Sequence, residues 1–148
     1  MSEYTRRSTL SLAIATGQKY RLSNGCPEFL ESHFMYGAIS CPNSSVQYIS
    51  ERLGLTEQLL GDGIQLQFYR EVAYTELIER KAVALFLGNQ QLLLLDVMHV
   101  FLTICLAASF SEFLERSGID AKDFVFEFYH LTGHAEIFEM ANRLGPSI

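Results

Sequence analysis

AVALFLGNQQLLLLDVMHVFLTICLAASFS, residues 82–111, is the stretch that decides how this chain folds. Asp96 is the only formal charge in these thirty residues. So apolar a segment needs shielding from water, by a membrane, by the core of its own domain or by a partner chain. Gly88 and Asn89 interrupt the run and divide it into two shorter apolar stretches. The pattern favours burial in the domain core, with part of the run extending into an interface with a partner.

Residues 92–110 have about the length of a membrane span, but their polar side chains argue against insertion. Asp96 and His99 fall inside this stretch, and an acidic residue deep in a span costs roughly 2.5–3.5 kcal/mol. No cluster of lysine or arginine marks either end. The sequence therefore predicts no membrane insertion.

The composition indicates one folded domain, residues 1–148, with 49% apolar residues and a net charge of −6. Residues 1–22 carry a net charge of +3, so residues 23–148 carry −9. An acidic protein is poorly suited to neutralising phosphate groups, which argues against nucleic-acid and anionic lipid partners. Three cysteines without Cys-x-x-Cys spacing are typical of a reducing compartment, so we expect a cytoplasmic protein.

Local patterns predict an α+β fold, with helices packed on a short antiparallel sheet. The apolar stretches 82–87 and 90–95 have the lengths of two hairpin strands. Residues 64–69 alternate between apolar and polar, which predicts a half-buried strand. A helix ended by Gly17 is expected to precede a strand at Lys19–Leu22. Residues 70–81 fit either a strand or a helix, and the apolar residues on both sides favour extended structure.

Several short polar signals predict helix ends. Ser44 precedes Gln47 at capping-box spacing, and Asp120 is expected to cap a later helix. Gly133 is expected to break the chain before a final helix. From Val97 the pattern predicts one long helix that ends near Gly118.

Two carboxylate–histidine pairs are the best candidates for metal ligands. Asp96 and His99, and Glu127 and His130, are spaced three residues apart, which on a helix places both side chains on one face. A small helical metal-binding protein is therefore one alternative function. If Asp96 lay on a strand, the same spacing would send its partner to the opposite face. We find no nucleophile motif and no phosphate-binding loop, so we expect neither an enzyme nor a cofactor.

Two segments, LAIATGQKYRLSN (Leu12–Asn24) and LLLLDVMHVFL (Leu92–Leu102), resemble the small acidic adaptor chaperones of Dot/Icm type IVB secretion systems, particularly the IcmS type. The chain is also similar in size and acidity to class I type III effector chaperones. The resemblance implies a non-enzymatic α/β adaptor that pairs with a second acidic subunit. It further implies an apolar surface for secretion substrates or for the tail of a coupling protein.

The sequence thus predicts an adaptor that binds partner proteins and forms a hetero- or homo-oligomer. Its interface is expected to lie along four consecutive leucines and a nearby phenylalanine, namely Leu92, Leu93, Leu94, Leu95 and Phe101. The acidic surface would select among partners by repulsion as well as attraction. An alternative function, of a different class, is that of an immunity or inhibitor protein that covers a basic toxin.

Overall fold

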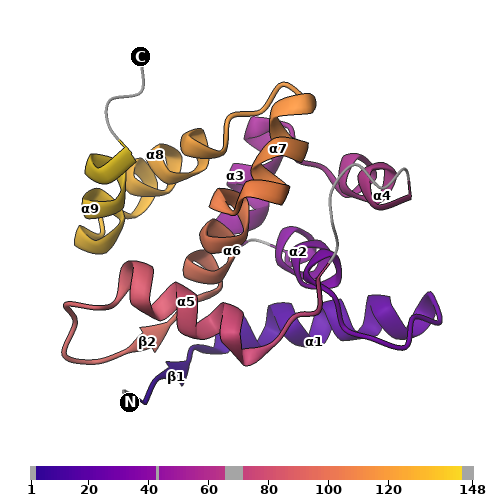
Figure 1. Ribbon diagram of the computed structural model, residues 1–148, viewed down its shortest axis with the longest axis horizontal. Helices are drawn as coiled ribbons and strands as arrows, with labels where there is room; N and C mark the ends of the chain where they lie inside the picture. Colours follow the sequence, from indigo (N-terminus) through magenta and orange to yellow (C-terminus); the bar gives the residue numbers. More distant parts are fainter. Residues whose placement is uncertain (1–2, 43, 66–71, 145–148) are drawn as a thin grey trace.

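The computed structural model describes residues 3–42, 44–65 and 72–144, and these fold into nine α-helices and two short strands (Figure 1). The elements in chain order are β1 (Thr5–Arg6), α1 (Ser8–Ser23), α2 (Glu31–Ser40), α3 (Ser45–Leu53), α4 (Glu57–Gln65), α5 (Glu76–Phe86), β2 (Leu94–Leu95), α6 (Val97–Leu106), α7 (Ala108–Arg116), α8 (Ala121–Thr132) and α9 (Ala135–Leu144). α6 lies near the centre, α1 runs along one side, and α8 and α9 lie together at another (Figure 1).

The predicted α+β fold with an antiparallel sheet is wrong, because the described chain is predominantly helical. Its sheet consists of β1 and β2, which pair in parallel with Thr5 opposite Leu94. The antiparallel pairing found in the described residues is a single bridge between Leu30 and Ala73.

The expected hairpin of residues 82–87 and 90–95 is absent, because the first stretch is helical. Glu79, Ala82 and Phe86 are the buried residues of α5, at the spacing of one helical face. A short run of apolar residues does not distinguish a buried strand from a buried helix. Of the second stretch, the strand comprises Leu94 and Leu95, and its partner comes from the N-terminal region.

Gly17 does not end the first helix, and Lys19–Leu22 is not a strand, because α1 continues to Ser23. A Cβ atom at Gly17 would lie 2.5 Å from the His33 carbonyl oxygen. At Gly37 of α2, a Cβ atom would lie 2.2 Å from the Ala13 carbonyl oxygen. The two glycines therefore let the backbones of α1 and α2 touch. In the sequence, a glycine needed for such close packing looks the same as a glycine that ends a helix.

The predicted helix caps are confirmed at three positions. The Ser44 hydroxyl accepts from the Gln47 N–H at 3.0 Å, and an Asp120 carboxylate oxygen accepts from the Lys122 N–H at 3.0 Å. Gly133 ends α8 in the left-handed conformation, with φ of 66°. These caps involve residues close in sequence, so local patterns are sufficient to predict them.

Two further strand predictions have mixed outcomes. Residues 64 and 65 belong to α4 rather than to the predicted strand, and residues 66–69 lie outside the described residues. Residues 70 and 71 of the expected extended segment also lie outside, and from Glu76 that segment is the helix α5. Thr75 begins this helix, because its hydroxyl accepts from the Leu77 N–H at 3.3 Å.

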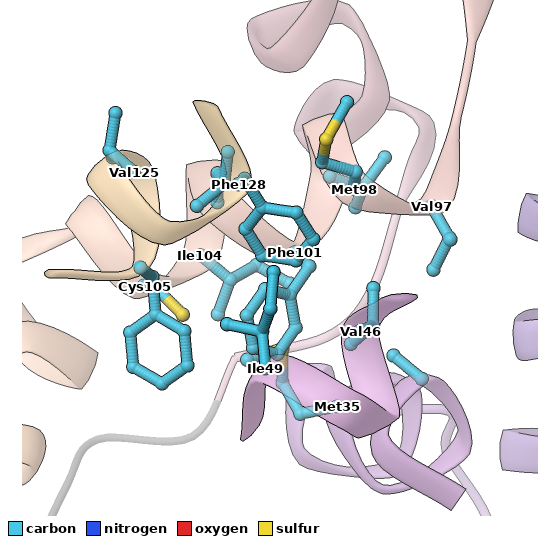
Figure 2. Packing of buried hydrophobic residues seen from close by; sticks show 14 of the residues in the cluster. Met35, Val46, Ile49, Val97, Met98, Phe101, Ile104, Cys105, Val125 and Phe128 are labelled. Carbon is cyan, nitrogen blue, oxygen red and sulfur yellow. The ribbon is translucent and has the colours of Figure 1, made fainter. Parts of the chain in front are cut away.

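The core is built around α6, in which every residue from Val97 to Cys105 is buried. The Phe101 ring centre lies 5.4 Å from that of Phe124 and 6.1 Å from that of Phe128, both in edge-on geometry. Figure 2 shows Phe101 among Phe128 and Ile49, so α8 and α3 cover α6 from two sides. The most apolar part of the chain is thus covered by the chain itself.

The long helix predicted from Val97 onward is broken at Ala107. This residue has an extended backbone, with ψ of 143°, and α6 and α7 meet there at an angle of 76°. Together the two helices reach the length and apolar character of a membrane span, but among the described residues no single helix does. The bend lets Phe110, Phe113 and Leu114 of α7 turn into the core.

β1 is fastened to α5 through Glu79, whose side chain is fully buried. The hydroxyls of Tyr4 and Tyr74 donate to this carboxylate at 2.6 and 2.7 Å, and Arg6 Nε donates at 3.0 Å. Burial and then the hydrogen bond to Glu79 raise the pKa of both tyrosines above the usual range. This network fixes the position of β1, and hence of β2.

Candidate partner-binding site

The two strands form a narrow ribbon whose faces border two different hollows. Thr5 pairs with Leu94, and Arg6 pairs with Leu95. Side chains alternate between the faces of a strand, so Leu94 and Leu95 of β2 point to opposite sides. The flanking Leu92 and Asp96 line the same hollow as Leu94, Leu93 lines the other hollow, and Leu95 is buried in the core. The register with β1 therefore decides which leucines face which hollow.

On the first side lies a hollow of about 610 Å³, which we call the α9-side hollow. The ribbon contributes Leu92 and Leu94 to its wall, and the start of α9 contributes Glu136. The remaining polar groups of the wall include Arg7, Asn89, Gln90, Gln91, Asp96, His99 and His134. Apolar and hydrogen-bonding groups thus meet in one concavity, which is the usual character of a binding site.

The opposite side has a second hollow, of about 510 Å³, which we call the α5-side hollow. Tyr4 and Leu93 line it from the ribbon, and Arg80 and Val83 line it from α5. The two hollows share Leu87, Gln90 and Gln91, so the segment between α5 and β2 separates them.

The structure divides the five predicted interface residues. Leu92 is 74% exposed and lies with the half-buried Leu94 in the α9-side hollow. Leu93 is half-buried in the α5-side hollow. Leu95 and Phe101 are fully buried in the chain's own core, so they are not available at this surface.

Sequence reasoning missed the polar half of the α9-side hollow. Arg7 and Glu136 are distant in sequence from the leucines and reach them through the tertiary fold. In the sequence, Asn89 reads as part of an interruption and Gln90 and Gln91 as part of a hairpin strand, although amide side chains beside exposed leucines are a signal for a mixed binding surface.

Asp96 and His99 hold the start of α6 by a reciprocal capping arrangement. An Asp96 carboxylate oxygen accepts from the Met98 N–H at 3.2 Å, and the Asp96 N–H donates to His99 Nδ1 at 3.0 Å. The three-residue spacing that suggested a metal-ligand pair therefore has a structural explanation. His33 accepts the Leu30 N–H at the start of α2 in the same manner, at 2.9 Å.

Glu136 joins α9 to this arrangement. Its Oε1 atom lies 3.3 Å from His99 Nε2 and 3.4 Å from His134 Nδ1. Burial lowers the pKa of His99, so its ring is neutral at pH 7. Since Nδ1 already accepts the Asp96 N–H, the proton resides on Nε2, which donates to Glu136. A ring bonded in this way serves to position α6 and α9, and it has no free lone pair with which to act as a base.

The alternative metal-binding function finds no support in the described residues, where no three His, Cys, Asp or Glu side chains gather as metal ligands. Glu127 instead pairs with Arg52, with 3.4 Å between Oε2 and Nε. His130 is exposed on α8. Neither predicted carboxylate–histidine pair is thus arranged as a pair of metal ligands: Asp96 and His99 cap α6, and Glu127 pairs with Arg52.

No protein-family model matches this chain, no curated protein matches it, and no solved structure matches its fold. The resemblance to IcmS-type adaptors stays a prediction that these comparisons do not test.

Proposed function

We propose that this protein is a non-enzymatic adaptor that binds a segment of a partner protein in the α9-side hollow. One observation carries the proposal. Leu92 exposes 74% of its surface on the wall of a concavity of about 610 Å³ that is lined mainly by polar side chains. A large apolar side chain at the edge of such a hollow is suited to pack against another polypeptide.

The expected binding energy is concentrated in the leucines. Covering a leucine side chain contributes about 1.5–3 kcal/mol, which corresponds to roughly tenfold to a hundredfold in affinity. Around Leu92 the amides of Asn89, Gln90 and Gln91 are exposed, and amides can both donate to and accept from a partner's backbone. An apolar centre with a polar rim is the common arrangement of protein interfaces.

Charge would contribute to the choice of partner. Asp96 and Glu136 line the α9-side hollow together with Arg7, and the chain as a whole carries a net charge of −6. Acidic partners would be repelled at long range, and basic ones attracted. The same property suits the alternative of an immunity or inhibitor protein, so the identity of the partner distinguishes these two functions.

Replacing Leu92 by aspartate is expected to weaken binding of the partner while leaving the fold intact, because a carboxylate would have to be buried in the interface. Leu77→Asp is the matched control, since Leu77 on α5 is 75% exposed and lies outside both hollows. The measurement compares the proteins that copurify from the native cell with wild type and with each variant. Binding of the leading candidate is then titrated with purified components.

We expect Leu92→Asp to weaken that binding by about tenfold or more, and Leu77→Asp to change it little. Thermal unfolding of both variants checks that the fold is retained. If the two substitutions affect binding equally, the hollow is not the binding site. A basic toxin as the partner would favour the immunity alternative, and secretion substrates would favour the adaptor.

A further inference from the structure

His99 is held so that an additional proton can enter at one ring nitrogen alone. In the neutral form Nε2 carries the ring proton and lies 3.3 Å from Glu136 Oε1. The other nitrogen, Nδ1, accepts the Asp96 N–H at 3.0 Å. Protonation at Nδ1 would bring two N–H groups face to face, and these repel each other. Charging His99 therefore requires that its bond to Asp96 break.

This bond lies where three elements of the α9-side hollow meet. Asp96 follows β2 directly and caps α6, and His99 is in the first turn of α6. Through Glu136 the same ring contacts the first turn of α9. If the ring turns away from Asp96, the bond from the Asp96 N–H to His99 is lost, and so is the bond from His99 to Glu136 at the start of α9, while the Asp96 carboxylate can still accept from the Met98 N–H.

We propose that His99 is an acid-sensitive latch, in which a proton at Nδ1 displaces the Asp96 N–H, breaks the reciprocal half of the α6 cap and loosens the α9-side hollow. As regulation of partner binding this inference rests on the proposed function. As a property of the fold it is independent of any partner.

The surroundings of the ring favour its neutral form in the closed state. Burial, which leaves 5% of the side chain exposed, lowers the pKa of His99, and the carboxylates of Glu136 and Asp96 oppose that shift. From α5 the ring meets the apolar Phe86, at 5.7 Å between ring centres. The other ionisable groups nearby are His134, which lowers the pKa further, and Arg7, which lines the same hollow.

The direction of the pH dependence follows from this lowered pKa. An opened or unfolded chain has a histidine pKa of about 6.5, so it binds the proton more tightly than the closed chain does. The closed form is therefore fully favoured above about pH 6.5 and becomes less favoured as the pH falls below that value. Between the two pKa values, opening should become about tenfold more frequent for each pH unit.

Amide hydrogen exchange of the wild-type protein tests the latch without a partner. We expect the Asp96 N–H to be well protected at about pH 7.5 and to lose protection, by up to about tenfold, by about pH 5.5, after correction for intrinsic exchange. Long-range ¹H–¹⁵N correlation should show His99 with its proton on Nε2 at neutral pH. Unchanged protection across this range, or a proton on Nδ1, would overturn the inference.

His99→Gln provides the decisive variant, because a glutamine oxygen at the third helical position accepts the same N–H but does not titrate. The Asp96 amide should then keep its protection at about pH 5.5. His130→Gln on the exposed face of α8 is the matched control and should behave as the wild type. If the glutamine variant does not fold, the wild-type exchange and tautomer measurements still decide the matter.

A local measurement is necessary because other groups influence global stability with pH. Burial raises the pKa of Glu31 to about 7, and His33 forms a capping bond like that of His99. Once a partner is known, its affinity should fall at acid pH for the wild type and not for His99→Gln. Absence of any partner would contradict the proposed function and leave the exchange result standing.

Discussion

Gly37→Ala is expected to destabilise the protein by about 3 kcal/mol, at the upper end of the cost of overpacking. The added Cβ atom would lie 2.2 Å from the Ala13 carbonyl oxygen and 2.6 Å from the Gly17 nitrogen. Both atoms belong to the backbone of α1, so the clash cannot be relieved by a change of rotamer. The two helices would have to move apart, and the buried surface between them would open. Urea unfolding monitored by circular dichroism measures the loss.

Gly61→Ala is the matched control for this prediction. Gly61 is also inside a helix, α4, and a Cβ atom there would meet no atom within 4 Å. Alanine is the better helix former, so this substitution should stabilise the protein by about 0.5–1 kcal/mol. Equal effects of the two substitutions would show that close contact between α1 and α2 does not determine stability.

Glu79→Ala is expected to cost about 3 kcal/mol, because it removes the acceptor shared by three donors. Tyr4, Tyr74 and Arg6 all donate to this fully buried carboxylate. The Arg6 side chain is 46% exposed and can be rehydrated, which keeps the cost at the lower end of the range for broken buried pairs. Urea unfolding gives the loss of stability. Exchange of the Thr5 and Arg7 amides, which donate to Leu93 and Leu95, should show that β1 detaches.

Glu76→Ala controls for the loss of a carboxylate from the same helix. Glu76 is 61% exposed and pairs with Arg80 one turn later, at 2.7 Å. Such surface pairs contribute about 0.5 kcal/mol or less. If Glu76→Ala and Glu79→Ala proved equally costly, the buried network could not be what holds β1 in place.

The candidate site could be predicted from the sequence only in part. The four leucines signalled an apolar surface, and of these Leu92 is largely exposed. Leu95 belongs to the core, and this could not be foreseen, because the side on which a strand residue lies depends on its pairing partner. Here that partner is β1, some ninety residues earlier in the chain. The contact between His99 and Glu136 likewise joins residues 37 apart.

The interruption at Gly88 and Asn89 shows that the fold, like the site, could be predicted only in part from local sequence patterns. A turn between two apolar stretches is equally compatible with a hairpin and with a helix followed by a strand. Burial of Ala82 and Phe86 against the rest of the core favours the helix. The sequence also left Gly17 open to two roles, and contact with the His33 carbonyl selects packing over helix termination.

By itself the sequence determined where several helices begin and end, because caps such as Ser44, Asp120 and Gly133 act on backbone groups within a few residues. It also determined that residues 82–111 must be shielded from water, since hydration of so many apolar side chains is unfavourable. Only the tertiary structure decided what shields them and which leucines stay at the surface. Those outcomes depend on contacts between distant segments, whose energies no local pattern contains.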